Sequence, residues 1–465
     1  MKILLTVPNS NCAIRDNLGV LSVPLGLGYI ASYLRNQGHD VQIHDGLLLR
    51  TTDSKFIQLL EDFQPDIVGI SGQATPTIQD VYHSANLVKQ FDSKVLVVVG
   101  GAHVTFQDFQ VLNECPEIDV VVRGEGEMTM NKLLVDYASK GHYLNVRGIT
   151  YRFNSSTIRN PDMPYIQNLD LLPFPAYDLL NLTNYYGPGL PVATMITSRG
   201  CPYGCIFCSS SRIVGKKWRG RSPENVVNEI RFLEQDFGVR EIEFVDDLFT
   251  FNYRRVKAIC EQMQSEGCQV GWTCSTRADI MARHPEMATW LKDAGCHTVY
   301  VGAESGSQRV LHFLRKGIKV EQVVQTVKTL NKAGLQSIVS FLTGIPRETK
   351  EEMQTTIDFA CQLNPDIAQF TVCTPYPGTP LYEMANQNGW LAKLKWRDFS
   401  VLKPVMNLPG LSKKLIKKFL YKAYLKFYTR PQYLWKQLRS GNLPLFKIIM
   451  QNIIRFGKDW RAVMR

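Results

Sequence analysis

The sequence of 465 residues lacks the features of membrane, secreted and fibrous proteins. No run approaches the roughly 18 uncharged apolar residues that a membrane-spanning helix needs. The opening residues, MKILLTVPNS, have no small-residue cleavage site, so they predict a first strand and not a secretory signal. Hydrophobic residues make up 45% and charged residues 20%, which excludes long disorder, coiled coils and collagen-like chains. We expect a globular cytoplasmic protein.

Cysteine is not arranged as in a disulfide-stapled protein. The count of eleven is odd, and the start of the chain predicts no secretory signal, so a disulfide framework is not expected. Three of the cysteines, Cys201, Cys205 and Cys208, lie within eight residues. The others are scattered, mostly among apolar residues, and are expected to be small core residues.

Excess charge is missing from most of the chain. The net charge is +11, but residues 411–465 alone contain 14 Lys and Arg and one acidic residue. The rest is near neutral, which argues against a body that binds nucleic acid. The basic end predicts contact with an anionic surface or partner.

Residues 1–144 alternate short β-branched runs with helical stretches. The expected strands are 2–7, 41–44, 66–70, 95–100 and 119–122, and the expected helices are 25–36, 54–63, 77–90 and 126–139. Continuous apolar strands separated by helices predict a parallel sheet covered on both faces. The fold class is therefore α/β, with a doubly wound, Rossmann-like first domain that binds ligands beyond the carboxyl ends of its strands.

Four loops at that edge of the predicted sheet contain glycine, which lets a backbone approach a large ligand closely. No G-x-G-x-x-G follows the first strand, so a dinucleotide is not expected. Ordinary tight turns are the alternative interpretation. The candidate ligand-binding residues of these loops are Pro24, Gly26, Ser71, Gly72, Gln73, Gly100, Gly101, His103, Glu125, Gly126 and Glu127.

A second α/β unit is expected after a linker. Residues 145–190 are rich in Pro, Asn and Asp and predict a linker along a domain seam. Strand–helix alternation resumes in residues 191–400 and predicts a partial (β/α)6 barrel of the TIM type, with its chemistry at the carboxyl ends of the strands. The expected strands are 192–197, 241–245, 270–274, 298–301, 337–342 and 367–372, and the expected helices lie near 223–236, 253–265, 284–294, 320–333 and 349–362.

The segment MITSRGCPYGCIFCSSS (195–211) carries the strongest chemical signal. Its cysteines have C-x3-C-x2-C spacing and follow the first barrel strand. Three thiolates in so short a loop can hold three corners of an iron–sulfur cubane and leave one iron open for a substrate atom. A structural zinc site, the alternative, needs four ligands, and no fourth Cys or His lies nearby in the sequence.

With Phe207 before the last Cys, this motif resembles the radical S-adenosylmethionine (SAM) superfamily. The segments FVDDLFT (244–250), STRAD (275–279), GAESGSQ (302–308), GIPRET (344–349) and PYPGTPLY (375–382) fit the same family. The resemblance implies a [4Fe–4S] cluster on Cys201, Cys205 and Cys208 that chelates SAM and cleaves it to methionine and a 5′-deoxyadenosyl radical. It also implies an electron donor such as flavodoxin or ferredoxin.

The same resemblance implies roles for residues at the barrel mouth. Asp246 and Asp247 close the second strand, where the family places contacts to the methionine amine. Glu304, followed by Ser305, is expected to accept hydrogen bonds from the SAM ribose or ammonium. Arg277 is expected to meet a carboxylate of the substrate, and Phe207 is expected to pack against the adenine. A solvated barrel-mouth side chain is the alternative for each.

Residues 1–144 resemble the cobalamin (B12)-binding domains that precede the barrel in one large branch of that superfamily. The segments GGAHVTF and RGEGE look like its corrin-contacting loops. The D-x-H-x-x-G motif that places a His below cobalt is absent, and His44-Asp45-Gly46 does not match it. We therefore expect base-off cobalamin, with an empty flavodoxin-like scaffold as the alternative.

Together the resemblances imply a cobalamin-dependent radical SAM enzyme that C-methylates an unactivated carbon of a lipid- or pigment-like small molecule. One alternative is an anaerobic oxidative cyclase with the same cofactors, acting on a magnesium-protoporphyrin ester or another tetrapyrrole, or forming a ring in a lipid. Another is a non-catalytic corrinoid and iron–sulfur sensor, which the retained barrel segments disfavour.

Residues 401–465 are expected to form a basic helical region. Between 413 and 428, apolar and aromatic residues recur at helical spacing and six lysines fill the other side. Two interpretations stay open: peripheral contact through 411–465 with the inner face of a membrane, or a helix that caps the barrel with a solvated lysine face. A second apolar stretch, 445–456, is too short to span a bilayer.

Overall fold

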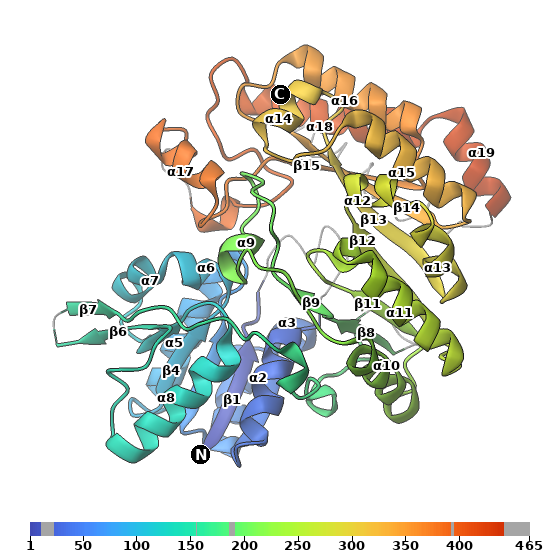
Figure 1. The fold of residues 1–465 in the computed structure, drawn as a ribbon. Coiled ribbons are helices and arrows are strands. Elements are labelled where there is room, and N and C mark those ends of the chain that lie inside the picture. Colours follow the sequence, from blue (N-terminus) through green and yellow to red (C-terminus); the bar gives the residue numbers. More distant parts are fainter. Residues whose placement is uncertain (11–22, 155, 186–190, 392–394, 441–465) are drawn as a thin grey trace.

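The computed structural model describes residues 1–10, 23–154, 156–185, 191–391 and 395–440, and it forms two α/β units followed by a pair of helices (Figure 1). The first unit contains a seven-stranded sheet of order β2-β1-β3-β4-β5-β6-β7. Its parallel strands are β1 (Lys2–Val7), β2 (Asp40–Asp45), β3 (Ile67–Ser71), β4 (Leu96–Gly100) and β5 (Val120–Val122). The doubly wound α/β domain predicted from the sequence is confirmed.

Both faces of this sheet are covered, because successive residues of each apolar strand point to opposite sides. Leu4 belongs to a core with α4 (Asp53–Phe63) and α5 (Ile78–Phe91), whereas Ile3 and Leu5 belong to a core with α2 (Leu25–Arg35) and α8 (Gly126–Lys140). The short helices α3 (Gly46–Leu49), α6 (Ala102–Phe106) and α7 (Asp108–Glu114) follow β2 and β4.

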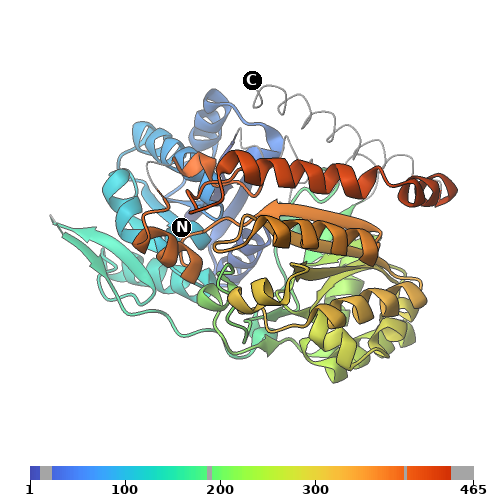
Figure 2. The ribbon, with the colours of Figure 1, turned by 90° about the horizontal axis from the view of Figure 1, so that it is seen from above.

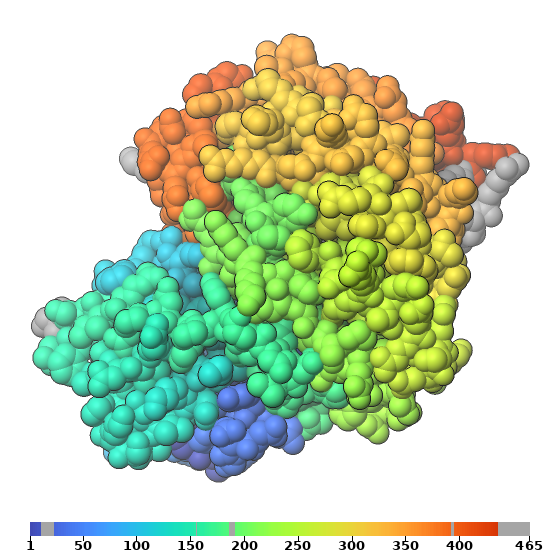
Figure 3. All heavy atoms as spheres, viewed as in Figure 1, coloured from blue at the N-terminus to red at the C-terminus, as the bar shows by residue number. Residues whose placement is uncertain are grey.

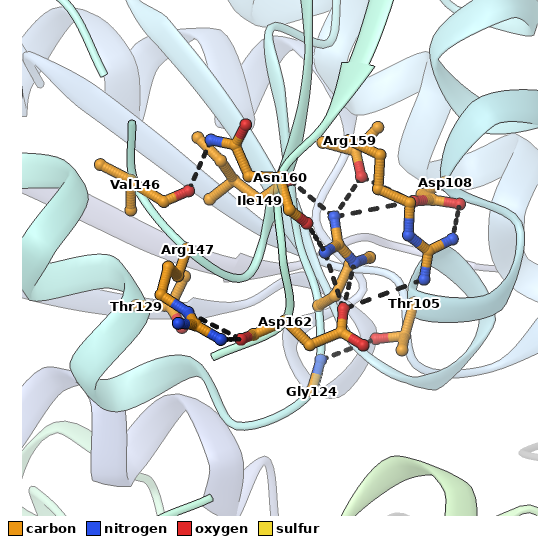
Figure 4. A network of polar contacts seen from close by, with 12 residues as sticks. Thr105, Asp108, Gly124, Thr129, Val146, Arg147, Ile149, Arg159, Asn160 and Asp162 are labelled. Carbon is orange, nitrogen blue, oxygen red and sulfur yellow. Dashed lines mark hydrogen bonds and ion pairs between the residues drawn. The ribbon is translucent and has the colours of Figure 1, made fainter. Parts of the chain in front are cut away.

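The predicted linker 145–190 contains a hairpin that extends the first sheet past the expected boundary at residue 144. Strands β6 (Ile149–Phe153) and β7 (Ser156–Arg159) pair antiparallel, and β6 pairs with β5. Buried Arg123 fastens the hairpin to the domain: it donates to the carbonyls of Ile149 and Asn160, each at 2.6 Å, and pairs with Asp162 at 2.7 Å. Figure 4 labels these three partners. In β6 only the first three residues are buried, and β7 has no buried residue. The composition of the segment therefore did not indicate a hairpin.

The second unit is a six-stranded parallel sheet of order β15-β14-β13-β12-β11-β8. The strands are β8 (Val192–Met195), β11 (Glu241–Phe244), β12 (Gly271–Thr276), β13 (Cys296–Glu304), β14 (Gln336–Thr343) and β15 (Ile367–Val372). Helices α10 (Pro223–Phe237), α11 (Tyr253–Ser265), α13 (Met287–Asp293), α15 (Val320–Lys332) and α16 (Lys350–Leu363) lie outside it. Within the described residues β8 and β15 do not pair, so the partial barrel is confirmed.

Short elements at the carboxyl ends of these strands were not predicted. They are β9 (Ser198–Arg199), α9 (Ser210–Ile213), β10 (Arg219–Gly220), α12 (Ala278–Arg283), α14 (Gln308–Phe313) and α17 (Pro380–Gln387). Each is too short to show a helical or strand period in the sequence.

The C-terminal helices cover the open edge of the barrel. Helix α18 (Lys413–Tyr428) runs beside β15 (Figure 2), with α19 (Pro431–Ser440) after it. The Tyr428 hydroxyl donates to the carbonyl of Ala368 at 2.8 Å and accepts from its N–H at 3.2 Å. The Tyr424 hydroxyl meets the carbonyl and N–H of Phe370 at 2.9 and 3.3 Å. The helix thus supplies hydrogen-bond partners to the free edge of β15.

The apolar face of α18 is therefore buried and not free to enter a lipid surface. Ile416, Leu420 and Phe427 are each 6% exposed or less, while Lys414 and Lys418 are exposed. In the part of the chain that the structure describes, no helix has the length and hydrophobicity to cross a membrane. The apolar stretch 445–456 lies outside the described residues.

Candidate cofactor sites at the domain seam

The cysteine loop follows β9 and is held in place by backbone hydrogen bonds. The N–H of Cys201 donates to the carbonyl of Gly215 at 3.1 Å, and that of Ile206 donates to the carbonyl of Leu314 at 3.0 Å. Gly200 has φ +96°, and a Cβ there would collide with the carbonyl oxygen of Lys217. The start of the loop therefore requires glycine.

The three thiols of the loop are half-buried and close enough to influence one another's protonation. Burial raises the pKa of Cys201 to about 11. Burial also raises the pKa of Cys205, while the nearby cations of Lys316 and Arg277 oppose that rise. In the described residues no three His, Cys, Asp or Glu side chains converge on a single ion. Three cysteines in one loop fit a cubane, in which each cysteine holds its own iron, whereas a structural zinc site needs a fourth ligand.

Arg277 connects the third barrel strand to the cysteine loop. Its guanidinium lies 3.4 Å from the ring centroid of Tyr203, within the loop. Its Nε donates to Asp279 at 2.9 Å and its Nη2 donates to the carbonyl of Lys316 at 2.7 Å. The arginine is buried and extensively bonded by the protein itself. Its contact with a substrate carboxylate stays a prediction.

Glu304 ends β13 in a backbone conformation that side chains rarely adopt, with φ +65°. Its buried carboxylate pairs with Lys316 Nζ at 2.6 Å, and that ammonium lies 5.8 Å from the Phe207 ring. Such strained residues concentrate at ligand sites. Ser305 is directed elsewhere, because its hydroxyl bonds Thr356 at 3.0 Å in the core.

The two aspartates after β11 have different surroundings. Asp246 is buried and accepts from the Thr197 N–H at 3.0 Å, from the Thr197 hydroxyl at 2.8 Å and from the Ser198 hydroxyl. It therefore fixes the segment before the cysteines. Asp247 is exposed, and its negative charge raises the pKa of Cys201. Asp247 is the one of the two that faces open space beside the cluster loop.

Four glycine-bearing segments lie at the carboxyl edge of the first sheet, in residues 24–28, 71–73, 100–103 and 123–127. We call these segments the glycine surface. The Gly72 N–H donates to the Gly100 carbonyl at 2.6 Å. Gly101 has φ +117°, and a Cβ there would lie 2.7 Å from the backbone nitrogen of Gln73. Gly26, behind Pro24 in the first turn of α2, has open space around it. Glycine at 72 and 101 lets the loops after β3 and β4 pack against each other, whereas Gly26 is the one of these three glycines with open space beside it.

His103 lies beside this surface with an unused nitrogen. Its Nδ1 bonds the Thr75 hydroxyl at 3.1 Å, while its Nε2 is buried without a partner. Burial lowers the pKa of the ring to about 4. Trp396, from a 3-10 turn (Trp396–Asp398), packs its ring edge-on at 5.0 Å. Sequence reasoning missed Trp396, because no local pattern connects it to a loop almost 300 positions earlier.

Glu125 and Glu127 lie in ion pairs with arginines of the barrel. Arg199 pairs with Glu125 at 3.2 Å and with Glu127 at 2.6 Å, and Arg219 pairs with Glu125 at 3.0 Å. All four side chains are at most 8% exposed. Gly126, between the two acids, begins α8. We call this cluster of four charged residues the arginine seam. Neither arginine was singled out by the sequence.

The arginine seam brings the two predicted sites together. Arg199 is separated from Cys201 by one residue, and Glu125 and Glu127 belong to the loop after β5. A Cβ on Gly124, in the same loop, would lie 3.7 Å from the carbonyl of Ile213, in the helix after the last cysteine. In Figure 3 the green segment around residues 200–220 reaches the surface between the cyan first domain and the yellow barrel. The glycine surface and the cysteine loop thus share one seam.

A cavity of about 210 Å³ lies at the carboxyl ends of β1 and β2 in the first domain. Its lining includes Asn9, His44, Thr51, Asp80 and His83. His44 Nε2 is bonded to the Thr51 hydroxyl at 2.9 Å. The cavity lies near the switch point of the sheet, where strand order reverses, which is the usual ligand position in such folds. No motif in the sequence indicates this cavity.

Comparison with known proteins shows both domains. Residues 195–360 match the family model of the radical SAM superfamily, and residues 12–134 match that of the B12 binding domain. The chain is 44% identical, over 98% of both chains, to an uncharacterized methyltransferase of Pyrococcus horikoshii. It is 28% identical to the anaerobic magnesium-protoporphyrin IX monomethyl ester cyclase of Cereibacter sphaeroides, over 88% of this chain and 67% of that relative. It is 27% identical to the hopanoid C-3 methylase of Methylococcus capsulatus, over 86% and 77%.

A solved structure has the same fold. The cobalamin-dependent SAM radical enzyme OxsB, with aqua-cobalamin and SAM bound, superposes with a TM-score of 0.76 at 19% identity. The match covers 96% of this chain and 71% of that one. It shows the same fold, while the family matches at residues 12–134 and 195–360 give the order of B12-binding domain and radical SAM domain.

Proposed function

Because this chain belongs to the radical SAM superfamily, in the branch with an amino-terminal B12-binding domain, we propose that it C-methylates an unactivated carbon of a lipid- or pigment-like small molecule. The chain is an enzyme whose relatives are methyltransferases and cyclases. The observation that carries the proposal is the arginine seam, which sets the cysteine loop against the glycine surface. Two cofactors that must share one substrate need such proximity.

The cofactors, when bound, supply a 5′-deoxyadenosyl radical from SAM on a [4Fe–4S] cluster and a methyl carrier in cobalamin. The protein's own task is to hold and separate them. Cys201, Cys205 and Cys208 hold the cluster, and the cations of Lys316 and Arg277 oppose the rise that burial causes in the pKa of Cys205. In our proposal Asp247 and Glu304 orient SAM, because both flank the cysteine loop, and Phe207 packs its adenine.

We propose that the first domain binds base-off cobalamin on its glycine surface. The surroundings of His44 support the base-off state, and those of His103 support a bound group at this surface. His103 stays neutral, because burial lowers its pKa, and its free Nε2 can donate to or accept from a bound group. His44 is already bonded to Thr51 at the end of β2.

Methylation is favoured over cyclisation by the relatives. The Pyrococcus protein, named as a methyltransferase, matches the whole chain at 44% identity, whereas the cyclase matches at 28%. Cyclisation remains the second candidate, since it would use the same cofactors. The relatives leave the sensor alternative without support. The substrate class rests on the pigment and lipid substrates in the names of the relatives.

The test uses anaerobically reconstituted full-length protein with methyl-labelled SAM, a reductant and lipid or pigment extracts. Label transferred to an extracted product, together with 5′-deoxyadenosine, supports methylation. An unlabelled product that has lost hydrogen supports cyclisation instead. Release of no 5′-deoxyadenosine under reduction would contradict both.

Cysteine variants provide the matched control. The wild type should hold about four irons per chain, and Cys201→Ala, Cys205→Ala or Cys208→Ala should each lose the cluster and all 5′-deoxyadenosine formation. Cys268→Ala, a half-buried cysteine outside the loop, should keep both. Equal iron in the wild type and the triple variant would overturn the cluster assignment.

A further inference from the structure

The outer face of the cysteine loop reaches solvent without a charge of its own. Pro202 and Gly204 are exposed, and residues 201–208, CPYGCIFC, contain no acidic or basic side chain. If the proposed function holds, on which this inference rests, the cluster must receive electrons from outside the chain. Electron transfer weakens steeply with the separation of two redox centres, so a donor has to dock close to this loop.

Two exposed lysines lie against the first end of the loop. The carbonyl of Gly215 accepts the hydrogen bond from Cys201, and Gly200 packs directly on the backbone of Lys217. Lys216 and Lys217 therefore come directly after Gly215, whose carbonyl is bonded to the proposed cluster ligand Cys201. Lys217 Nζ bonds only a neutral partner, Gln167, at 3.1 Å, and within the described residues neither lysine has an ion pair.

A third exposed cation lies at the second anchor of the loop. The carbonyl of Leu314 accepts from Ile206, and the next residue, Arg315, is exposed and has no ion pair in the part of the chain that the structure describes. Two nearby acidic groups are already matched, since Glu304 pairs with Lys316 and Glu383 pairs with Arg212. Exposed Asp247, also beside the loop, is outnumbered by the three exposed cations. The surroundings of the loop are thus positive, although the chain before residue 411 is near neutral.

We propose that Lys216, Lys217 and Arg315, the basic rim, dock a small acidic one-electron carrier protein with a reduced flavin or iron–sulfur centre. One electron passes from the carrier, which is oxidised by one electron, to the cluster, which is reduced by one. Opposite charge steers such encounters and fixes the orientation of the docked pair, without needing a large apolar interface.

The experiment measures two quantities for reconstituted full-length enzyme: the dissociation constant for an acidic flavodoxin, which should rise in the rim variants, and 5′-deoxyadenosine formation with two sources of electrons. One is an acidic flavodoxin kept reduced by its reductase, and the other is a small chemical reductant. The Lys216→Glu/Lys217→Glu variant should need roughly tenfold more flavodoxin for half-maximal rate. Arg315→Glu should act in the same direction. With the chemical reductant, both variants should match the wild type. The matched control, Lys328→Glu/Lys332→Glu, reverses two exposed lysines on α15.

Salt provides a second readout. Added salt should slow 5′-deoxyadenosine formation by the wild type with flavodoxin. It should also reduce the difference in this rate between the wild type and the rim variants, because screening weakens the attraction between the opposite charges. Equal flavodoxin dependence in wild type and rim variants overturns the docking site while leaving the proposed function intact, and so does a wild type that accepts electrons only from the chemical reductant. No 5′-deoxyadenosine from the wild type with either source overturns the proposed function itself.

Discussion

Glu348 is a buried carboxyl group whose ionisation should make the stability of the folded protein depend on pH. It follows β14, and its Oε2 accepts the N–H groups of Gly344 and Ile345 at 2.9 and 3.1 Å. Its Oε1 is buried without a partner. Burial raises the pKa of this carboxyl to about 8. The folded protein therefore keeps Glu348 protonated at neutral pH.

We expect Glu348→Gln to flatten the pH dependence of stability. Glutamate in the unfolded chain ionises near pH 4.5, and Glu348 in the folded protein ionises near pH 8. The contribution of this group to the free energy of unfolding is therefore complete below about pH 4.5, and it is lost as the pH rises toward 8. Each tenfold difference in proton affinity is worth about 1.4 kcal/mol. Glutamine keeps the acceptor and cannot ionise. Thermal unfolding at several pH values should show that the melting temperature of the variant rises relative to that of the wild type as the pH increases.

The control for this measurement is Glu352→Gln. Its Arg309 partner lowers the pKa of Glu352 to about 2, so the variant should lose stability at neutral pH and recover it only in strong acid. Parallel profiles for wild type and Glu348→Gln would show that Glu348 is charged in the fold.

Single residues were predictable from the sequence where local spacing carries the chemistry. Cys201, Cys205 and Cys208 lie in one loop as expected, and Glu304 lies at the end of its strand. The neighbours of these residues were not predictable. Lys316, Arg199 and Arg219 reach their carboxylates through the tertiary fold, and nothing local distinguishes them from surface cations.

At the scale of elements, the arginine seam joins the loop after β5 to β9 and β10 through buried charges. Buried ion pairs contribute little net stability, but removing one partner leaves a charge without compensation. The Oε2 atom of Glu127 already lacks a partner, so its carboxylate depends on Arg199.

Arg199→Met should lower the free energy of unfolding by about 3–5 kcal/mol, measured by urea unfolding of the cofactor-free protein. The double variant Arg199→Met/Glu127→Leu should recover a large part of that loss, because it removes both charges. The matched control is Arg240→Met. Arg240 is exposed, and its partner Glu234, 15% exposed, keeps the hydrogen bond from the Gln269 N–H, so the change should cost less than about 1 kcal/mol. A similar small cost at Arg199 would mean that the seam is hydrated and open.

Long elements were predicted to within a few residues, because buried strands and amphipathic helices show their period. The expected strand 367–372 is β15 and the expected helix 253–265 is α11, residue for residue. The hairpin of β6 and β7 was missed, since β7 is a short, polar edge strand.

At the scale of the molecule, the lysines of α18 form a surface apart from the neutral body. We propose that this surface contacts anionic lipid at the inner face of a membrane. Since the apolar face of the helix is buried, contact must be electrostatic, with each lysine near the surface adding up to ~1 kcal/mol.

Lys414→Glu/Lys417→Glu/Lys418→Glu should therefore reduce co-sedimentation with anionic vesicles, while neutral vesicles should bind neither protein. This variant keeps the buried face of α18, which deletion of 411–465 would not. The α15 variant Lys328→Glu/Lys332→Glu should bind as the wild type does. If wild-type protein ignores anionic vesicles at low salt, the helix is purely a cover for the barrel.

The hydroxyls that line the open edge of the barrel have one more consequence. Tyr424, Tyr428 and Tyr433 occupy the backbone groups of Phe370, Ala368 and Asp366, alternate positions on the same side of the chain. A bare edge of this kind is a template on which another chain can add a strand. Helices α18 and α19 thus prevent another chain from pairing with this edge. A chain truncated before Lys413 would fail first by aggregating edge to edge, at a temperature where its barrel is still folded.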